Sequence, residues 1–250
     1  YCVAGTSCNY SQNWPGPDNP NHVVNTYIEA NGKVTGVRRP GSASNDLTIG
    51  YDGNGRVSSI ADHGGTPTYA YADAGNARTV TVTNALSQTS TYVFDIALQR
   101  LTAFTNPLSQ TVGYQYYPNG RVTRITRPEG NYTQFTYDAR GNVTESRSVG
   151  KAGSGVADIV TTASYPATCS NPVVCNSPTS TTDARGNVTT YTYDSTHGGV
   201  LTVAAPAPTT AATAPQIRYS YVSQQAQVKN ASGALVGSGT NVTLPSAVAQ

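Results

Sequence analysis

Polar and apolar residues alternate one by one along much of the chain. The alternation is clear in "VTRITR" at 122–127 and in "NVTTYTY" at 187–193. Such a period of two places apolar side chains on one face of a β-strand and polar side chains on the other. Between these stretches lie short clusters of Gly, Asn, Asp, Ser and Pro, which favour turns. The pattern predicts an all-β protein built from short strands and tight turns.

The turn sequences recur at a regular interval. An aromatic residue followed by a turn returns every 20 to 23 residues between Tyr51 and Tyr137, and a second kind of turn lies about ten residues after each of them. Examples of the first kind are "YDGNGRV" (51–57) and "YDARGNV" (137–143), and of the second "TNALSQT" (83–89), "TNPLSQT" (105–111) and "DARGNVT" (183–189). The chain therefore reads as tandem β-hairpins of about 20 residues each.

The residue types in these turns have a physical reason. An Asp or Asn at the first position can accept hydrogen bonds from the backbone two residues on, and a later Gly can take the left-handed conformation that closes the hairpin. The residues that define the repeat are Tyr51, Asp52, Gly55, Tyr71, Gly75, Tyr116, Gly120, Tyr137, Asp138, Gly141, Asn142, Asp183, Gly186, Asn187, Tyr193 and Asp194. The unit at 95–101, "DIALQRL", has lost its Gly.

The apolar positions favour one architecture over another. A single hairpin is marginally stable in water, so the hairpins must lie side by side. The alternating positions carry Thr, Tyr, Val and Ala, with few Leu, Ile or Phe to fill the core between two sheets of a sandwich. We therefore expect a curved sheet whose inner face is not filled by its own side chains.

Composition limits the classes of partner. The formal net charge is +2 and 11% of the 250 residues are charged, which gives no reason to expect nucleic acid as a partner. No apolar run is long enough to span a bilayer. The first residues, "YCVAGTSCNY", contain neither an initiator Met nor a signal peptide, so we expect a piece of a longer polypeptide.

The four cysteines form two pairs with the same spacing, Cys2 with Cys8 and Cys169 with Cys175. Five residues lie within each pair, more than the two to four that zinc ligand pairs usually have. Two local disulfides, each worth about 2 kcal/mol, are the preferred interpretation and would indicate a compartment outside the reducing cytosol. Free thiols and a metal site remain alternatives.

At "YDGNGRVSSI", "YYPNGRVTRITRPEGNYTQFTYDARGNVTES" and "TTDARGNVTTYTYD" the chain resembles the YD repeat of RHS (rearrangement hot spot) proteins. The resemblance covers roughly 27–221 and is most specific at 114–147. That family includes bacterial polymorphic toxins, shell subunits of insecticidal toxin complexes and teneurins. The resemblance implies a ribbon of strands wound in a spiral into a hollow β-shell, which in bacterial members encloses a toxic C-terminal domain. It also implies a secreted or cell-surface protein of bacteria.

We accordingly expect four regions. They are an N-terminal flank with a Cys pair (1–26), YD repeat units (27–147), an insertion with the second Cys pair (148–180), and further repeat units (181–250) with a Pro/Ala/Thr-rich loop at 201–216. The expected partners are the rest of a longer chain, an enclosed C-terminal domain and, as an option, glycans. A secreted or surface carbohydrate-binding or adhesive array is the alternative function.

Candidates for chemistry are few. His63 and His197 lie in "DHGGT" and "THGGV", which resemble an esterase oxyanion loop, but no Gly-x-Ser-x-Gly motif accompanies them. The periodic Asp residues could in principle supply a glycosidase pair, and the Arg residues beside the turn glycines could bind anions. Turn formation explains both sets more simply. We predict no enzymatic activity, no catalytic residues, no cofactor and no metal.

Overall fold

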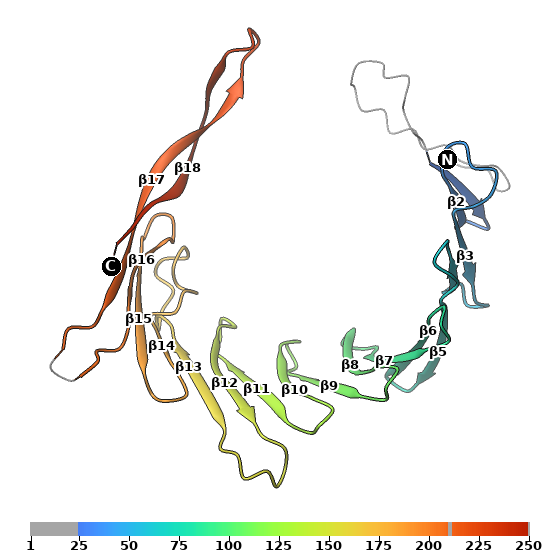
Figure 1. Cartoon of the computed structure of the whole chain (residues 1–250), viewed down its shortest axis with the longest axis horizontal. Coiled ribbons are helices and arrows are strands. Elements are labelled where there is room, and N and C mark those ends of the chain that lie inside the picture. Colours follow the sequence, from blue (N-terminus) through green and yellow to red (C-terminus); the bar gives the residue numbers. More distant parts are fainter. Residues whose placement is uncertain (1–24, 210–211, 250) are drawn as a thin grey trace. The chain divides into compact units, whose positions relative to one another are not determined.

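A computed structural model describes residues 25–209 and 212–249. All regular secondary structure among them is β-strand (Figure 1). The chain divides into two units, residues 1–114 and 115–250. The expected all-β fold of tandem antiparallel hairpins is confirmed.

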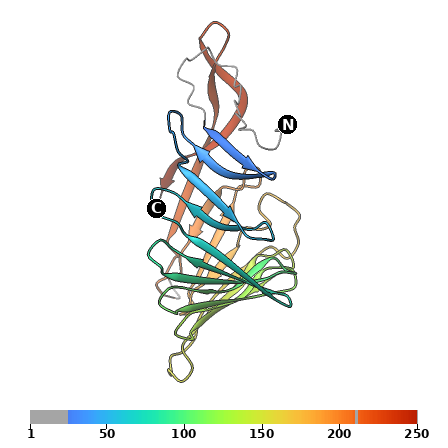
Figure 2. The ribbon, with the colours of Figure 1, turned by 90° about the vertical axis from the view of Figure 1, so that its right-hand side faces the viewer.

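In the first unit every strand pairs with the next one along the chain, always antiparallel. Figure 2 shows these strands side by side, with turns at both ends of each strand. The strands are β1 (Thr26–Ala30), β2 (Lys33–Arg38), β3 (Leu47–Tyr51), β4 (Val57–Ala61), β5 (Thr68–Ala74), β6 (Ala77–Thr83), β7 (Thr89–Asp95), β8 (Arg100–Thr105) and β9 (Thr111–Tyr116), the last of which reaches into the second unit.

The second unit has the same sequential, antiparallel pairing from its first strand to its last. Its strands are β10 (Val122–Thr126), β11 (Tyr132–Tyr137), β12 (Val143–Val149), β13 (Ile159–Ser164), β14 (Ser180–Thr182), β15 (Val188–Tyr193), β16 (Val200–Ala204), β17 (Gln216–Lys229) and β18 (Leu235–Ala249). Sequential antiparallel pairing places alternate turns at opposite edges of the sheet. We call the edge that carries the turns after Tyr51, Tyr137 and Tyr193 the YD edge.

A five-residue turn recurs at both edges of the sheet. In the turn 52–56 the Asp52 N–H donates to the Arg56 carbonyl (2.8 Å), and the Gly55 N–H donates to the Asp52 carbonyl (2.9 Å). Gly55 has φ +78°, in the left-handed region that a side chain disfavours. The same pair of backbone bonds closes turns 84–88, 106–110, 117–121, 127–131, 138–142, 183–187 and 230–234.

Among the described residues, four that carry a side chain take the left-handed conformation: Asn31 (φ +54°), between β1 and β2, and three in later turns. Ser87 (φ +60°) and Ser109 (φ +62°) stand where other turns have Gly, and Gln99 has φ +52° in the unit that lost its Gly. The geometry is therefore kept where the residue changes, because strand pairing on both sides of the turn holds it.

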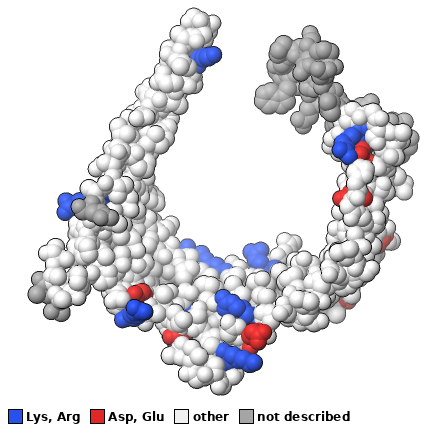
Figure 3. Space-filling model, in the orientation of Figure 1, with Lys and Arg blue, Asp and Glu red and all other residues white. Residues whose placement is uncertain are grey.

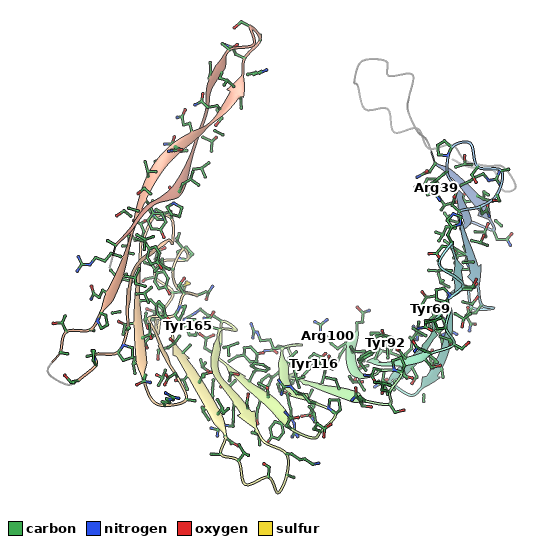
Figure 4. All side chains as sticks on the ribbon, in the orientation of Figure 1. Arg39, Tyr69, Tyr92, Arg100, Tyr116 and Tyr165 are labelled. Carbon is green, nitrogen blue, oxygen red and sulfur yellow. A yellow bond between two sulfur atoms is a disulfide. The ribbon has the colours of Figure 1, made fainter. Side chains whose placement is uncertain are left out.

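The two faces of the first unit differ in chemistry. Directly opposed residues of five successive strands form an apolar row on one face: Tyr71, Val80, Tyr92, Phe104 and Val112. The next row, on the other face, is Ala70, Thr81, Thr91, Thr105 and Thr111. We call these rows the aromatic face and the threonine face. Tyr69, two residues before Tyr71 on β5, also lies on the aromatic face, and Figure 4 labels it together with Tyr92.

The second unit repeats this division in shorter rows. Tyr191 lies opposite Val203, which lies opposite Ile217, and this row is apolar. On the other face Thr192 lies opposite Thr202, with 2.6 Å between their hydroxyl oxygens.

Hardly any side chain is fully covered. Among the described residues only Gly36, Thr133 and Cys175 are buried, and no large side chain is. A sandwich of two sheets would bury the aromatic face, so the single-layer architecture agrees with the few large apolar residues in the sequence. Charged side chains are sparse on the surface that Figure 3 shows.

Some boundaries differ from the sequence-based expectations. The region expected as an insertion, 148–180, contains the end of β12, all of β13 and the start of β14. The loop expected at 201–216 is shorter, because residues up to Ala204 belong to β16. A hydrogen bond from the Ala205 N–H to the Pro215 carbonyl (2.9 Å) joins the two ends of the remaining loop. The β-branched residues of "VLTVA" in β16 favour a strand, and the neighbouring Pro and Ala residues mask this preference in the composition.

Cys169 and Cys175 form a disulfide with Cα atoms 4.9 Å apart. Cys2 and Cys8 lie outside the described residues.

The strained turns generate a prediction. Ser109→Gly removes the cost of a left-handed serine and should raise the free energy of unfolding by about 0.5 kcal/mol after the larger chain entropy of Gly is subtracted. The reciprocal change Gly186→Ser, at φ +82°, should lower it by about 1 kcal/mol. Urea unfolding of both variants measures this, and equal midpoints for the two would contradict the turn assignment.

Candidate functional site

The tyrosines of the repeat join neighbouring strands at the YD edge. In each case the phenol O–H donates to a backbone carbonyl of the preceding strand or of the segment leading into it. The pairs are Tyr51 with Val34 (2.7 Å), Tyr71 with Val57 (2.8 Å), Tyr137 with Val122 (2.8 Å), Tyr165 with Val143 (3.2 Å), Tyr193 with Pro178 (2.8 Å) and Tyr221 with Val200 (3.0 Å). We call this row of contacts the tyrosine seam.

The seam lies where backbone pairing stops. The last paired residues of β10 and β11 before the YD edge are Arg124 and Gln134, and Tyr137 lies three residues further on. There the Val122 carbonyl accepts from a side chain and not from a backbone N–H. The seam therefore extends the connection between adjacent hairpins beyond the end of their ladder.

Cationic side chains cover several rings of the seam. Lys33 Nζ lies 4.9 Å from the ring centre of Tyr51, and the Arg56 guanidinium lies 4.4 Å from that of Tyr71. Arg121 lies over Tyr137 at 5.9 Å. In each case the cation precedes the valine whose carbonyl receives the tyrosine O–H. The sequence "Gly-Lys/Arg-Val" thus supplies both the cation and the carbonyl that the tyrosine of the next hairpin contacts.

The aspartates of the repeat hold the turns together. Oδ1 of Asp183 accepts from the backbone N–H groups of Arg185 and Asn187, both at 2.9 Å. Its Oδ2 accepts from the Asn187 side-chain amide at 2.9 Å. Asp138 makes the same contacts with Arg140 and Asn142.

Uncharged residues do the same work in other turns. Oδ1 of Asn106 accepts from the backbone N–H groups of Leu108 and Gln110, both at 3.0 Å, and its amide donates to the Gln110 side chain at 2.9 Å. Asn84 and Gln88 repeat this pairing. In these turns the first residue is an acceptor, charged or not, and its side chain pairs with that of the fifth residue. Turns 117–121 and 127–131 begin with Tyr117 and Arg127 and are closed by the same backbone bonds without an Asp or Asn at the first position.

These bonds lower the pKa values of the turn carboxyls. The Arg56 backbone N–H holds the pKa of Asp52 below its ordinary value, and the Asn187 amide does so for Asp183. Partial burial acts to raise the pKa of Asp138, but the side-chain and backbone bonds from Asn142 outweigh it and the pKa is lowered. Carboxyls held ionised as turn acceptors are poor candidates for general acids.

The other chemical candidates lie in turns. His63 contacts Arg39 (3.0 Å) and Asp46 (3.3 Å) at an exposed turn, where the Arg39 backbone N–H lowers the pKa of Asp46 to about 2. His197 lies in the turn after Asp194, and its Nδ1 accepts from the Gly199 N–H (3.1 Å). Among residues 25–209 and 212–249, no three His, Cys, Asp or Glu side chains lie close enough together to hold a metal ion. The described residues also form no helix that is long and apolar enough to cross a membrane.

The arginines beside the turn glycines have structural partners. Arg56 pairs with Asp52 (2.8 Å) as well as lying over Tyr71. Arg140 pairs with Asp138 (3.3 Å), and Arg121 donates to the Arg140 carbonyl (3.1 Å). These contacts favour the structural interpretation of the arginines over an anion-binding stripe.

Sequence reasoning missed two members of the seam. Tyr165 is followed by Pro and Tyr221 by Val, so neither carries the Tyr-Asp signature. A usable signal was the strand alternation that leads into the tyrosine in "TASY" and in "IRYSY". Conversely, Phe94 fills a repeat position without a hydroxyl and cannot join the seam.

Two shallow hollows lie on either side of Tyr165. One, of about 390 Å³, is lined among others by Glu145, Thr162 and Asp183. The other, of about 400 Å³, includes Asp138 and Arg140. Both are open to solvent, and each combines an aromatic ring with a carboxylate.

The RHS Repeat family matches residues 116–152, which run from the end of β9 through β10, β11 and β12. The chain contains an RHS repeat. No curated protein sequence matches the chain significantly. The matched segment includes the turn 138–142 and the Tyr137 contact, so the RHS signature coincides with the seam and the turn acceptor described above.

Solved structures share the fold of this chain. A chain of the crystal structure of TcdB2-TccC3-TEV superposes on 80% of it with a TM-score of 0.53 and 15% identity. A chain of the Photorhabdus luminescens Tc holotoxin pore, in a form with a mutation in TccC3, covers 88% of it with a TM-score of 0.51 and 14% identity. The present chain spans only 11% and 14% of the lengths of these two chains.

The seam predicts the effect of removing one hydroxyl. Tyr137→Phe keeps the ring under Arg121 and deletes the donor to the Val122 carbonyl, so the free energy of unfolding should fall by about 1 kcal/mol. Tyr132→Phe is the matched control, because Tyr132 meets Arg124 through its ring. Denaturant unfolding measures the free energy of unfolding of both variants. If Tyr137→Phe loses no more of it than Tyr132→Phe, the contact of the Tyr137 hydroxyl with Val122 contributes nothing to stability.

The turn acceptors predict the pH dependence. The pKa of Asp183 is lowered in the folded state, so its stabilisation is present above the unfolded value of about 3.9 and is lost as the pH falls through the folded value. Asp183→Asn should therefore reduce the loss of stability between about pH 5 and pH 2, and Asn106→Asp should increase it. Urea midpoints measured across this range test both, and identical pH profiles for the two variants would refute the assignment.

Proposed function

We propose that this chain is a non-enzymatic wall segment of a larger RHS protein, part of a β-shell that encloses or presents a C-terminal, toxin-like domain. The observation that carries the proposal is the uncovered aromatic face of a single-layer sheet. In a self-contained domain that face would be packed against a second layer.

The two faces of the sheet differ in chemistry, as is expected of a wall whose two sides meet different surroundings. The threonine face presents small side chains with hydroxyls, such as Thr105 and Thr111, whose oxygens lie 2.9 Å apart. The aromatic face carries Tyr92 and Phe104, with ring centres 4.9 Å apart and neither ring fully covered. A row of half-exposed apolar side chains that no second layer of the described chain covers is typical of an interaction face, so we assign the aromatic face to contact with an enclosed chain.

The comparisons support the proposal through fold alone. The RHS repeat and the likeness to Tc toxin structures are compatible with a wall, and the small share of those chains that it spans implies that the remainder of the shell lies elsewhere. We assign the protein to the secreted or cell-surface class on the same grounds. Enzymatic activity is not part of the proposal, because the repeated carboxyls already serve as turn acceptors.

One observation favours the second candidate, a carbohydrate-binding surface array. The hollow beside Tyr165 joins an aromatic ring to Glu145 and Asp183, groups that can stack on a sugar ring and accept from its hydroxyls. Binding to a glycan array that disappears in Tyr165→Ala would favour this function over the shell.

Limited proteolysis of the natural full-length protein tests the shell. The domain that follows the repeats should resist protease in the intact protein and be cleaved at least about tenfold faster when it is produced alone. Gly141→Val should open the wall and raise cleavage, because Gly141 has φ +95° and an added Cβ would meet the Arg121 guanidinium.

Gly53→Ala is the matched control, since no atom lies within 4 Å of its added Cβ and its φ is not in the left-handed region. It should leave protection unchanged. A downstream domain cleaved equally fast inside and outside the intact protein would overturn the proposal.

A further inference from the structure

One turn of the YD edge is replaced by a long loop with a cross-link. Residues 165–179 connect β13 to β14 and contain the Cys169–Cys175 disulfide. Along this edge the neighbours of the loop are the turn 138–142, between β11 and β12, and the turn 194–199, between β15 and β16. We call residues 165–179 the cystine loop.

The cystine loop is bonded to the turn on one side. The Arg140 guanidinium donates to the carbonyls of Pro166 (2.6 Å) and Ala167 (3.4 Å). The Asn142 amide donates to the side chain of Asn176 (3.2 Å). Both donors belong to the same turn, so that turn is attached to the loop before and after the cross-link.

It is bonded to the turn on the other side as well. The Asn171 amide donates to the Ser195 carbonyl (2.8 Å). Val173 lies against Gly198, where an added Cβ would come within 3.1 Å of the valine methyl and 3.2 Å of its carbonyl oxygen. The contact residues Asn171 and Val173 lie between the two cysteines.

The shape of the loop depends on its own cross-link. Residues 165–178 contribute no strand to the sheet. The segment between the cysteines is held by the bonds from the Cys175 N–H to the Asn171 carbonyl (3.0 Å) and from the Val173 N–H to the Asn171 side chain (3.0 Å). Cys175, only 3% exposed, is the most deeply placed apolar side chain of the described part of the chain.

We propose that the Cys169–Cys175 disulfide is a reducible brace of the YD edge: when oxidised it fixes the cystine loop between the turns 138–142 and 194–199, and its reduction releases both turns while the strands remain paired. Reduction frees the segment that carries Asn171 and Val173, so the contacts to the turn 194–199 are lost first. Backbone pairing of β12 to β13 and of β15 to β16 does not involve the loop and persists.

The two sulfurs differ in access, which sets the course of reduction. Cys169 is exposed and Cys175 is buried, so an external thiolate attacks the sulfur of Cys169. The S–S bond breaks, Cys175 leaves as a thiolate and takes up a proton, and a mixed disulfide remains on Cys169. A second thiol attacks this mixed disulfide, so that two thiols are oxidised to one external disulfide and the protein gains two thiols.

Hydrogen exchange of the chain with the Cys169–Cys175 disulfide intact and after treatment with dithiothreitol tests the brace. Peptides covering 138–142, 165–179 and 194–199 should lose protection by up to about fiftyfold on reduction, the factor expected for a loop of this length. Peptides from β5 to β7 should not change. The variant Cys169→Ser with Cys175→Ser should show the reduced pattern without reductant.

Cys2→Ser with Cys8→Ser is the matched control and should keep the oxidised pattern at the three segments. Asn171→Ala should loosen 194–199 and the segment between the cysteines but not 138–142, while leaving the disulfide intact, which distinguishes the brace from a general effect of reductant. Unchanged exchange at both turns on reduction would overturn the proposal. So would a loss of protection that extends to β5–β7, because the cross-link would then support the whole fold and not one edge.

Discussion

Lateral hydrogen bonding between antiparallel backbones is the interaction on which the rest of this structure depends. Each strand is held by its neighbours along the chain, and the described side chains provide almost no buried core to hold it in any other way. In a chain of this size the hydrophobic effect usually dominates folding. Here it acts mainly on one half-covered face, so the register of the ladders decides which side chains meet. The aromatic and threonine faces are consequences of that register.

Register in turn depends on the turns and the tyrosine seam. A left-handed residue at the fourth position of each five-residue turn, and in most of these turns an Asp or Asn at the first position, fix where one strand ends and the next begins. The tyrosine hydroxyl then ties that end to the preceding hairpin. The Tyr-Asp pair of the repeat therefore has two separate duties: Tyr51 reaches back to Val34, whereas Asp52 closes the turn ahead of it. Neither duty requires a ligand.

Much of this was predictable because hairpins are local. Alternation and turn residues at 116–143 predict β10, β11 and their turns, since every partner lies within a few residues. The seam was harder, because a tyrosine's acceptor is a backbone carbonyl in the previous hairpin and carries no sequence signal of its own. Tyr165 and Tyr221 were missed for this reason. The cystine loop shows the same limit: the spacing of Cys169 and Cys175 predicts a local cross-link, but nothing in it indicates that Asn171 contacts Ser195.

We propose that another part of the protein covers the aromatic face. Hydroxyl-radical footprinting of the full-length protein, with and without the domain that follows the repeats, measures this at Tyr69, Tyr92 and Phe104. These rings should be shielded when the domain is present and should be oxidised several times faster when it is removed. The oxidation rate of Tyr137 in the seam should not change. Equal oxidation of the three rings in both forms would contradict the proposal.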